Sequence, residues 1–307
     1  MKILVYGIGA MGSIYASLMS DAGNDVFVVD KWKEHIKRIQ ESGLKVHGAS
    51  GNRITKQLKS FYSVPQNETF ELIIVATKAS GVENASFELK NCIQKNTIIL
   101  SIQNGLGSSE KLTKHIPEKN ILLGVADGFG ASIVSPGEIH HNAMKLIRIG
   151  EINGGQSIRL KKVLNLFLDA GFNSKIYENI NQLIWEKFIC NVTFSAPCTV
   201  YNCNIGQLMK TNNLWKVALG CTQEAYNIAI RKNIPLSFEN PIEYVTDFGS
   251  KMPNAKPSML LDHESKRKSE IDFINGKVAE MGNDLDMPTP YNLMLSEIIK
   301  IKEKSFL

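Results

Sequence analysis

The chain has 307 residues, of which 43% are hydrophobic and 21% charged, and its net charge of +5 forms no long run of one sign, which disfavours a nucleic-acid-binding protein. No apolar stretch approaches the ~20 residues that a membrane helix needs, and glycines interrupt the N-terminal apolar run too early for a signal peptide. The five cysteines match no metal or redox spacing, so we expect reduced thiols in a cytoplasmic protein without a metal site.

The first half of the chain alternates strand-like and helix-like segments. The strand-like runs are residues 2–7, 25–30, 70–78 and 96–105, and helical patterns occupy residues 11–23 and 33–43. Continuous apolar runs are typical of strands buried on both faces of a parallel sheet. An extended pair around Pro136 and Gly137, a helix over 158–170 and a last edge strand over 173–178 follow. We therefore expect a Rossmann-type doubly wound α/β domain over residues 1–177.

The second half of the chain has a different character. After about Glu178 helical periodicity dominates and no further strand-like run appears, so we expect an all-helical domain over residues 178–307. One helical stretch covers residues 258–282 and places Ser258, Asp262, Lys266 and Glu270 at steps of four. This helical half also leaves a homodimer open.

A glycine motif, "GIGAMG", follows the first strand and opens the first helix. The first glycine permits a tight turn, the second lets a pyrophosphate approach the backbone, and the third allows close packing of helix on strand. Such turns also arise for packing alone, but the flanking strand and helix favour a dinucleotide site. Its candidate residues are Gly7, Gly9, Ala10, Met11 and Gly12.

Two charged residues end the second strand-like run. Asp30 lies 18 residues after Gly12, close to the ~20 expected for a carboxylate that contacts the adenosine ribose. The alternative interpretation of Asp30 is a helix N-cap. Asp30 favours a free 2′-hydroxyl and would repel a 2′-phosphate, whereas the adjacent Lys31 would attract one. The residues alone therefore leave NADPH and NADH both open.

Lys187 lies in "IWEKFICN", among large apolar side chains that we expect to form the buried face of a helix: Ile184, Trp185, Phe188 and Ile189. Burying an ammonium is unfavourable, and lysines usually extend their charge to water. Lys187 therefore either extends its ammonium group to solvent or holds it in a substrate site. Asn191 and Ser195 follow at steps of four, so we expect them to project from the same helix face as Lys187. A cleft between a dinucleotide domain and a helical domain is a common place for a substrate.

Together these motifs resemble the ketopantoate reductase (2-dehydropantoate 2-reductase) family over essentially the full chain. The matching pieces are "GIGAMG", "ATKA" around Lys78, "QNGLG" around Asn104, "EKFICN" with Lys187 and Asn191, and "PSMLLD…SEIDFINGKV" with Ser258 and Glu270. The last block is the most distinctive of them.

The resemblance implies an NADPH-dependent reduction of ketopantoate to D-pantoate, with a small 2-keto acid as substrate. It makes Lys187 the general acid and gives Glu270 the task of binding and orienting the substrate. It further implies that Asn104 and Ser258 contact the substrate, Asn191 supports the site, and Lys78 and Asn104 lie beside the cofactor.

The chain departs from the family pattern at several positions. Ser195, Ala255 and Ile205 stand where the family often has asparagines, and Lys31 stands where it typically has an arginine for the 2′-phosphate. These departures keep open an NAD-dependent D-2-hydroxy acid dehydrogenase that acts on branched 2-keto acids. A non-catalytic nucleotide-sensing protein is the remaining alternative.

Overall fold

A computed structural model describes residues 1–306 and divides into two compact units. The first unit comprises Met1–Gln103 and Gly107–Ile180, and the second comprises Asn104–Leu106 and the chain from Asn181 onward. None of the helices within the described residues is long and apolar enough to cross a membrane.

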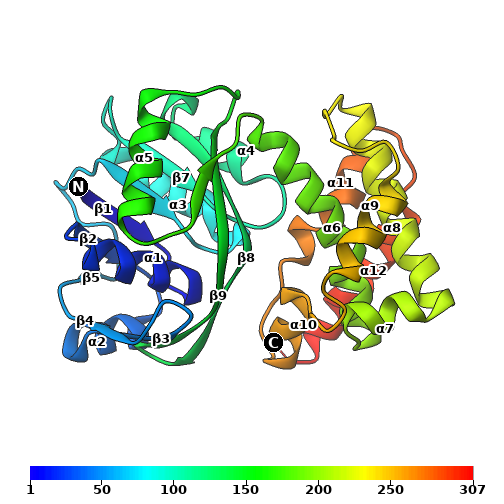
Figure 1. Cartoon of the computed structure of the whole chain (residues 1–307), viewed down its shortest axis with the longest axis horizontal. Helices are drawn as coiled ribbons and strands as arrows, with labels where there is room; N and C mark the ends of the chain where they lie inside the picture. The colour runs from blue at the N-terminus through cyan, green and yellow to red at the C-terminus, as the bar shows by residue number, and fades with distance from the viewer. Residues whose placement is uncertain (307) are drawn as a thin grey trace. The chain divides into compact units, whose positions relative to one another are not determined.

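The first unit is an α/β fold built on a ten-stranded mixed sheet (Figure 1). Its strands are β1 (Lys2–Tyr6), β2 (Asp25–Val29), β3 (Leu44–Gly48), β4 (Arg53–Thr55), β5 (Lys59–Phe61), β6 (Leu72–Val75), β7 (Ile98–Ser101), β8 (Ile121–Ser135), β9 (Glu138–Glu151) and β10 (Ser174–Ile176). Its helices are α1 (Ala10–Asp21), α2 (Lys33–Ser42), α3 (Val82–Leu89), α4 (Ser108–Thr113) and α5 (Ile158–Asp169), with short 3₁₀ turns η1 (Ala79–Gly81), η2 (Lys90–Cys92) and η3 (Glu118–Asn120).

Six strands are parallel in the order β5-β2-β1-β6-β7-β8. This is the doubly wound order in which the chain moves outward from β1 on one side and then returns to the other. The expected Rossmann-type α/β class is therefore confirmed.

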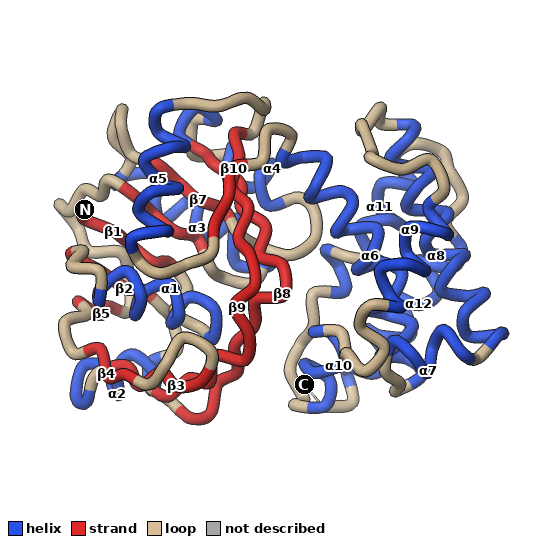
Figure 2. The backbone as a smooth tube through the Cα atoms, in the orientation of Figure 1, coloured by secondary structure: helices blue, strands red, loops and turns tan. Residues whose placement is uncertain are grey.

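The long antiparallel pair β8 and β9 extends this sheet, as Figure 2 shows. The two strands are joined through Pro136 and Gly137, where Gly137 has a φ of +78°, so the extended pair expected around this turn is confirmed. β9 also pairs in parallel with β3 and β10, and β4 adds antiparallel to β3.

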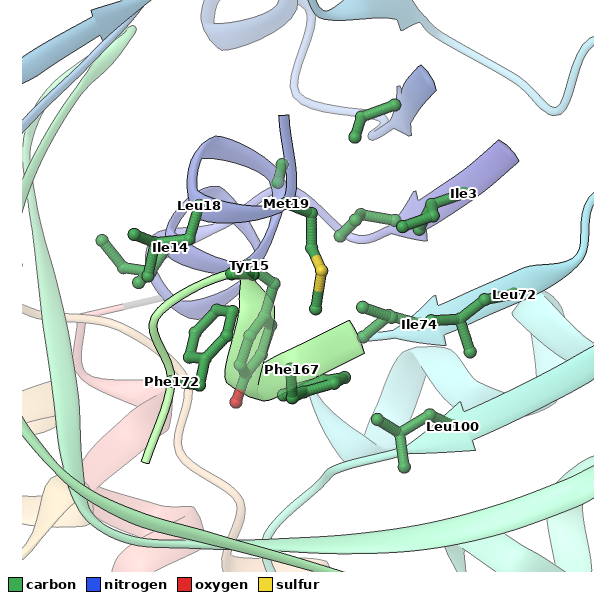
Figure 3. Packing of buried hydrophobic residues seen from close by; sticks show 14 of the residues in the cluster. Ile3, Ile14, Tyr15, Leu18, Met19, Leu72, Ile74, Leu100, Phe167 and Phe172 are labelled. Atoms are coloured by element: carbon green, nitrogen blue, oxygen red, sulfur yellow. The ribbon is translucent and has the colours of Figure 1, made fainter. Parts of the chain in front are cut away.

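The core of the first unit lies against the sheet, under α1 and α5. Figure 3 shows Tyr15 of α1 beside Phe167 and Phe172, with Leu72 and Leu100 of the sheet close by. The Tyr15 ring lies 6.3 Å from Phe167 and 5.8 Å from Phe172, between ring centroids. Residues that alternate with the strand members of this cluster are also fully buried: Leu4, Ile73 and Ile99. Both faces of the parallel strands are therefore covered, which explains their continuous apolar runs.

The second unit is helical in the residues that the structure describes. Its elements are α6 (Ile180–Tyr201), α7 (Ile205–Lys210), α8 (Asn212–Arg231), α9 (Pro241–Ser250), α10 (Ser258–Glu264), η4 (Ile271–Phe273), α11 (Asn275–Asp284) and α12 (Pro290–Lys304). The side chains of Phe188, Ile189 and Val192 are at most 1% exposed, so α6 contributes a central part of this unit's core.

The single helix expected over residues 258–282 is wrong. α10 ends at Glu264, Lys266 adopts a left-handed conformation with a φ of +54°, and η4 begins only at Ile271. Residues 262–270, "DHESKRKSE", are all polar and offer no apolar stripe that a helix could bury. The steps of four between Ser258 and Glu270 therefore do not define one helix face.

Candidate active site

The candidate cofactor residues of the first unit lie at the carboxyl edge of its sheet. The strand order reverses between β1 and β6, and ligands of open α/β sheets bind outside the carboxyl ends of the strands at such a point. The glycine motif follows β1, Lys78 follows β6, and Asp30 and Lys31 follow β2. Because these strands are parallel, the structure brings together three segments that are separated in sequence.

The three motif glycines meet different surroundings. Gly7 has a φ of +93°, and a Cβ there would lie 2.6 Å from the backbone nitrogen of Thr77. A Cβ on Gly12 would overlap the carbonyl oxygen of Gly7. A Cβ on Gly9, in contrast, would meet no atom within 4 Å. Packing therefore requires Gly7 and Gly12, whereas Gly9 leaves the backbone open to an approaching group.

The first turn of α1 faces that open space. Gly9 is the N-cap of α1 and has no side chain that could cap this helix start. Uncapped backbone N–H groups and the positive end of the helix dipole attract anions. The site therefore fits a pyrophosphate, which would approach the backbone at Gly9.

The buried His35 is connected to the glycine loop by hydrogen bonds. The backbone N–H of Gly137 donates to His35 Nδ1 at 2.9 Å, and His35 Nε2 lies 3.4 Å from Ser13 Oγ, which donates to the carbonyl oxygen of Ile8 at 3.1 Å. Since Nδ1 accepts, a neutral imidazole carries its proton on Nε2 and donates to Ser13. Burial lowers the pKa of His35, which favours that neutral form. Sequence reasoning missed this residue because nothing in the motif points to it.

Asp30 and Lys31 have separate neighbours. Asp30 Oδ1 accepts a hydrogen bond from the backbone N–H of Trp32 at 2.9 Å. Trp32 itself is the N-cap of α2, so the interpretation of Asp30 as the helix N-cap is wrong. Lys31 is largely exposed, and its Nζ lies 3.2 Å from Oε1 of Glu88 on α3. Sequence reasoning did not identify Glu88.

The segment of Asn104 packs within the second unit. Gly105 has a φ of +81°, and a Cβ on it would overlap the carbonyl oxygen of Phe273. The backbone N–H of Leu106 donates to the same oxygen at 3.2 Å. Phe273 ends η4, which begins immediately after Glu270. The structure thus places the segment of Asn104 against the segment that follows Glu270.

The α6 stripe consists of Lys187, Asn191 and Ser195. Lys187 and Asn191 are half-buried, and Ser195 is buried. Around Lys187 the side chains of Trp185, Phe188 and Ile189 are buried as expected, but Ile184 is only half-buried. The side chain of Lys187 is therefore shielded from much of the solvent.

Glu186, the residue before Lys187, is buried as well. Its Oε1 accepts the backbone N–H of Ser237 at 2.7 Å and the amide of Gln182 at 2.9 Å. These hydrogen bonds compensate its burial, and they hold this turn of α6 against the loop that precedes α9.

A buried asparagine connects the segment of Glu270 to α6. Asn275, the first residue of α11, donates to the carbonyl oxygen of Val192 and to Asn292 Oδ1, both at 2.9 Å. Asn292 in turn donates to Glu224 Oε2 at 2.6 Å. Val192 follows Asn191 directly. The segment that carries Glu270 is therefore fixed beside the turn of α6 that carries Asn191.

Ser258 and Glu270 lie on either side of the break after α10. Ser258 is the exposed first residue of α10 and follows the N-cap Pro257. Glu270 is half-buried. The backbone N–H of the preceding Ser269 donates at 2.7 Å to Oε1 of Glu303, and His263 Nε2 lies 3.3 Å from the same oxygen. The buried Glu303 on α12 therefore anchors the turn from which Glu270 projects.

Metal ligands do not cluster in the described part of the chain. Residues 1–306 contain no group of three or more His, Cys, Asp or Glu side chains arranged to hold a metal ion. The adjacent His140 and His141 lie on β9, where the ring of His140 packs at 5.1 Å against that of His47 and His141 Nδ1 lies 2.7 Å from Ser50 Oγ.

Comparisons with known proteins match both halves in chain order. The family model "Ketopantoate reductase PanE/ApbA" matches residues 3–154, and "Ketopantoate reductase PanE/ApbA C terminal" matches residues 179–303. The 2-dehydropantoate 2-reductase of Streptococcus pyogenes serotype M1 is 31% identical over 304 residues, which cover 99% of this chain and 98% of that protein. The 2-dehydropantoate 2-reductase of Pyrococcus abyssi (strain GE5 / Orsay) is 28% identical over 303 residues, with the same shares covered.

A solved structure of a different enzyme is also similar. D-mandelate dehydrogenase, in a ternary structure with NADH and anilino(oxo)acetate, superimposes with a TM-score of 0.91 at 28% sequence identity. The superposition covers 100% of this chain and 99% of that chain. The same fold thus occurs in D-mandelate dehydrogenase.

Proposed function

Because the chain belongs to the ketopantoate reductase family, we propose that it is a 2-dehydropantoate 2-reductase that reduces ketopantoate to D-pantoate with NADPH. NADH is a second hydride donor in this proposal because Asp30 follows β2. The observation that carries the proposal is the match to proteins of that name over 99% of the chain, since it includes the glycine loop and the α6 stripe together.

The first unit would hold the dinucleotide. Its pyrophosphate would lie over Gly9 at the start of α1, and its adenosine ribose would lie beside Asp30 and Lys31. Lys78, exposed after β6, would lie along the cofactor. When bound, the nicotinamide supplies a hydride to C2 of the substrate.

Lys187 would supply the proton. As C2 gains the hydride, negative charge develops on its oxygen, and the Lys187 ammonium donates a proton there to give the hydroxyl group. Water then returns a proton to the amine. The partly shielded position of Lys187 strengthens its interaction with the developing oxyanion, because less water screens it.

Four further residues would bind and orient the substrate. The hydroxyl of Ser258, at the first turn of α10, would bind the substrate carboxylate together with the amide of Asn104. Asn191 would support Lys187 from the next turn of α6. Glu270 would accept a hydrogen bond from the terminal hydroxyl of ketopantoate. The bond from Asn275 to Val192 supports this assignment, since it fixes the segments of Glu270 and Asn191 beside each other.

A second candidate function is an NAD-dependent D-2-hydroxy acid dehydrogenase that acts on branched 2-keto acids. Two observations favour it: the similarity to D-mandelate dehydrogenase and the carboxylate of Asp30 after β2. In that enzyme Glu270 would position Lys187 rather than bind a substrate hydroxyl.

Initial rates separate these functions. Ketopantoate, trimethylpyruvate and 2-ketoisocaproate would each be assayed with NADPH and with NADH. Trimethylpyruvate has nearly the shape of ketopantoate but lacks the terminal hydroxyl, so a site that pairs this hydroxyl should prefer ketopantoate by roughly 10²–10³ in kcat/KM. Equal turnover of both compounds would favour the dehydrogenase. Dinucleotide binding without turnover of any keto acid would favour a nucleotide sensor.

We also propose a cytoplasmic location. Within residues 1–306 the five cysteines form no disulfide, and four of them are buried. Thiols of this kind persist in a reducing compartment. Alkylation of the unfolded protein from cells, followed by mass spectrometry, would count its free thiols, and a disulfide in that material would contradict the proposal.

A further inference from the structure

Glu88 on α3 holds a fixed position beside the end of β1. Its Oε2 accepts the hydroxyl of Tyr6 at 2.6 Å, and its Oε1 accepts the amide of Asn84 at 2.6 Å. The amide of Asn84 also lies 3.2 Å from the Tyr6 hydroxyl. Tyr6 is buried and is the last residue before Gly7. These hydrogen bonds leave the carboxylate little freedom to turn away.

The carboxylate of Glu88 is charged in this position. Burial alone would raise its pKa, but the hydrogen bonds from Tyr6, Asn84 and Lys31 outweigh burial and hold the pKa below its usual range. Burial, reinforced by the neighbouring Glu88, raises the pKa of the Tyr6 phenol. The proton therefore stays on Tyr6 and the negative charge on Glu88.

Lys31 forms an ion pair with the Glu88 carboxylate. Its Nζ lies 3.2 Å from Glu88 Oε1, and its chain neighbour is Asp30. The end of β2 is where Rossmann-type folds distinguish a ribose 2′-hydroxyl from a 2′-phosphate. Asp30, Lys31 and Glu88 thus bring two carboxylates and one ammonium near the end of β2. A 2′-phosphate must draw Lys31 away from Glu88 while it approaches both carboxylates, whereas a 2′-hydroxyl needs neither change.

We propose that Glu88 is a specificity-determining residue for the cofactor. Glu88 competes with the 2′-phosphate of NADPH for Lys31, and it therefore reduces the ratio by which the protein binds NADPH more tightly than NADH. The inference rests on the proposed use of a nicotinamide dinucleotide. The ion pair is solvent-accessible, with 67% of the Lys31 side chain exposed, so it is weak and the effect is correspondingly modest.

The test is equilibrium binding of NADPH and NADH to the full chain without substrate, followed by nicotinamide fluorescence. Glu88→Gln removes the charge and keeps the length of the side chain. Glu83→Gln is a matched control, since Glu83 lies on the same helix but pairs with Lys114 at 2.6 Å. Lys31→Gln, alone and with Glu88→Gln, completes a double-mutant cycle.

In Glu88→Gln we expect the dissociation constant for NADPH to fall by roughly 3- to 10-fold, while that for NADH changes by less than about 2-fold. Glu83→Gln should change neither constant. With Gln at position 31 the effect of Glu88→Gln should shrink to less than about half, because it acts through Lys31. An unchanged ratio of the two constants in Glu88→Gln, or an equal change in Glu83→Gln, would overturn the inference.

Two further outcomes are informative. If Glu88→Gln does not fold, Lys31→Gln alone tests the inference. Because Lys31 is already paired with Glu88, its replacement should lower the protein's affinity for NADPH by less than about 3-fold. A loss of about 30-fold or more would show that Lys31 is fully available to the phosphate, and would overturn the inference. Failure of the unmodified protein to bind either dinucleotide would instead refute the proposed function, and this inference with it.

Discussion

Gly9 and Gly12 are three residues apart, yet substitution by alanine should affect them in different ways. A methyl group on Gly12 would overlap the carbonyl oxygen of Gly7, which is backbone and cannot rotate away. A methyl group on Gly9 would meet no atom within 4 Å, and the backbone of Gly9 is extended, with a φ of −68° that lies outside the left-handed region. One variant should therefore lose stability, and the other should lose ligand binding.

The magnitudes follow from these contacts. Overpacking in a closed core usually costs about 1–3 kcal/mol, and the rigidity of the Gly7 carbonyl places Gly12→Ala near the upper end even after the better helix propensity of alanine. At ~2–4 °C per kcal/mol, the midpoint of thermal unfolding should fall by roughly 6–12 °C. Gly9→Ala should change stability by less than about 0.5 kcal/mol. Its methyl group would occupy the space that the pyrophosphate needs, so NADPH affinity should fall by roughly 10- to 100-fold.

Circular dichroism on heating and fluorescence titration with NADPH measure the two effects separately. Gly23→Ala is a poor control because Gly23 has a φ of +81°, so the unmodified protein serves as the reference. Undiminished NADPH binding by Gly9→Ala would show that no phosphate approaches the backbone there. An unchanged unfolding midpoint in Gly12→Ala would show that the loop yields, contrary to the packing argument.

Four further predictions concern the site. Lys187→Ala should lower kcat by roughly 10²–10⁴ without loss of the fold, and an unaltered steady-state rate would return Lys187 to a surface role. Asp30→Ala should lower the KM for NADPH relative to NADH, since it removes a like charge near the phosphate; a hundredfold preference of the unmodified enzyme for NADH would contradict the choice of NADPH. Glu270→Gln should reduce turnover of ketopantoate more than that of trimethylpyruvate, and equal losses would argue against contact with the terminal hydroxyl. The pKa of His35 in the folded state lies below its usual value of 6.5. The neutral His35 therefore contributes to stability above pH 6.5, and this contribution is lost as the pH falls from 6.5 through the folded-state pKa. Urea unfolding at pH 7.5 and pH 5 should therefore show a smaller loss in His35→Gln than in the unmodified protein.

Local sequence patterns were sufficient for part of the first unit, whereas β3, β4, β5, α3 and α4 were not predicted. The apolar run before Gly7, the charge at Asp30 and the turn at Gly137 each act on their own neighbours, so hydrophobic periodicity and glycine placement identify them. Lys187 and Asn191 could be assigned to one helix face for the same reason, since a four-residue step in a helix is local geometry.

Features that depend on distant segments were not predictable. Glu88 reaches Lys31 only because the sheet order places β1 beside β2 and α3 beside the end of β1, and this order has no local signature. The break between Ser258 and Glu270 is stabilised by Glu303, which is 34 residues beyond Ser269. A run of polar residues permits either an exposed helix or a turn, and the hydrogen bond from Ser269 to this distant carboxylate favours the turn.

The short segment Asn104–Leu106 belongs to the second unit, although the chain on both sides of it belongs to the first. The polypeptide therefore changes unit after Gln103, after Leu106 and again after Ile180. A fragment that stops at residue 180 would retain residues 104–106 but would lack the helical unit to which they belong. Leu106 would then lose the apolar cluster against which it packs. The helical half is consequently not a module that recombination can exchange at a single junction. A chimera with a relative would keep the native packing of Leu106 only if residues 104–106 were transferred together with the helices.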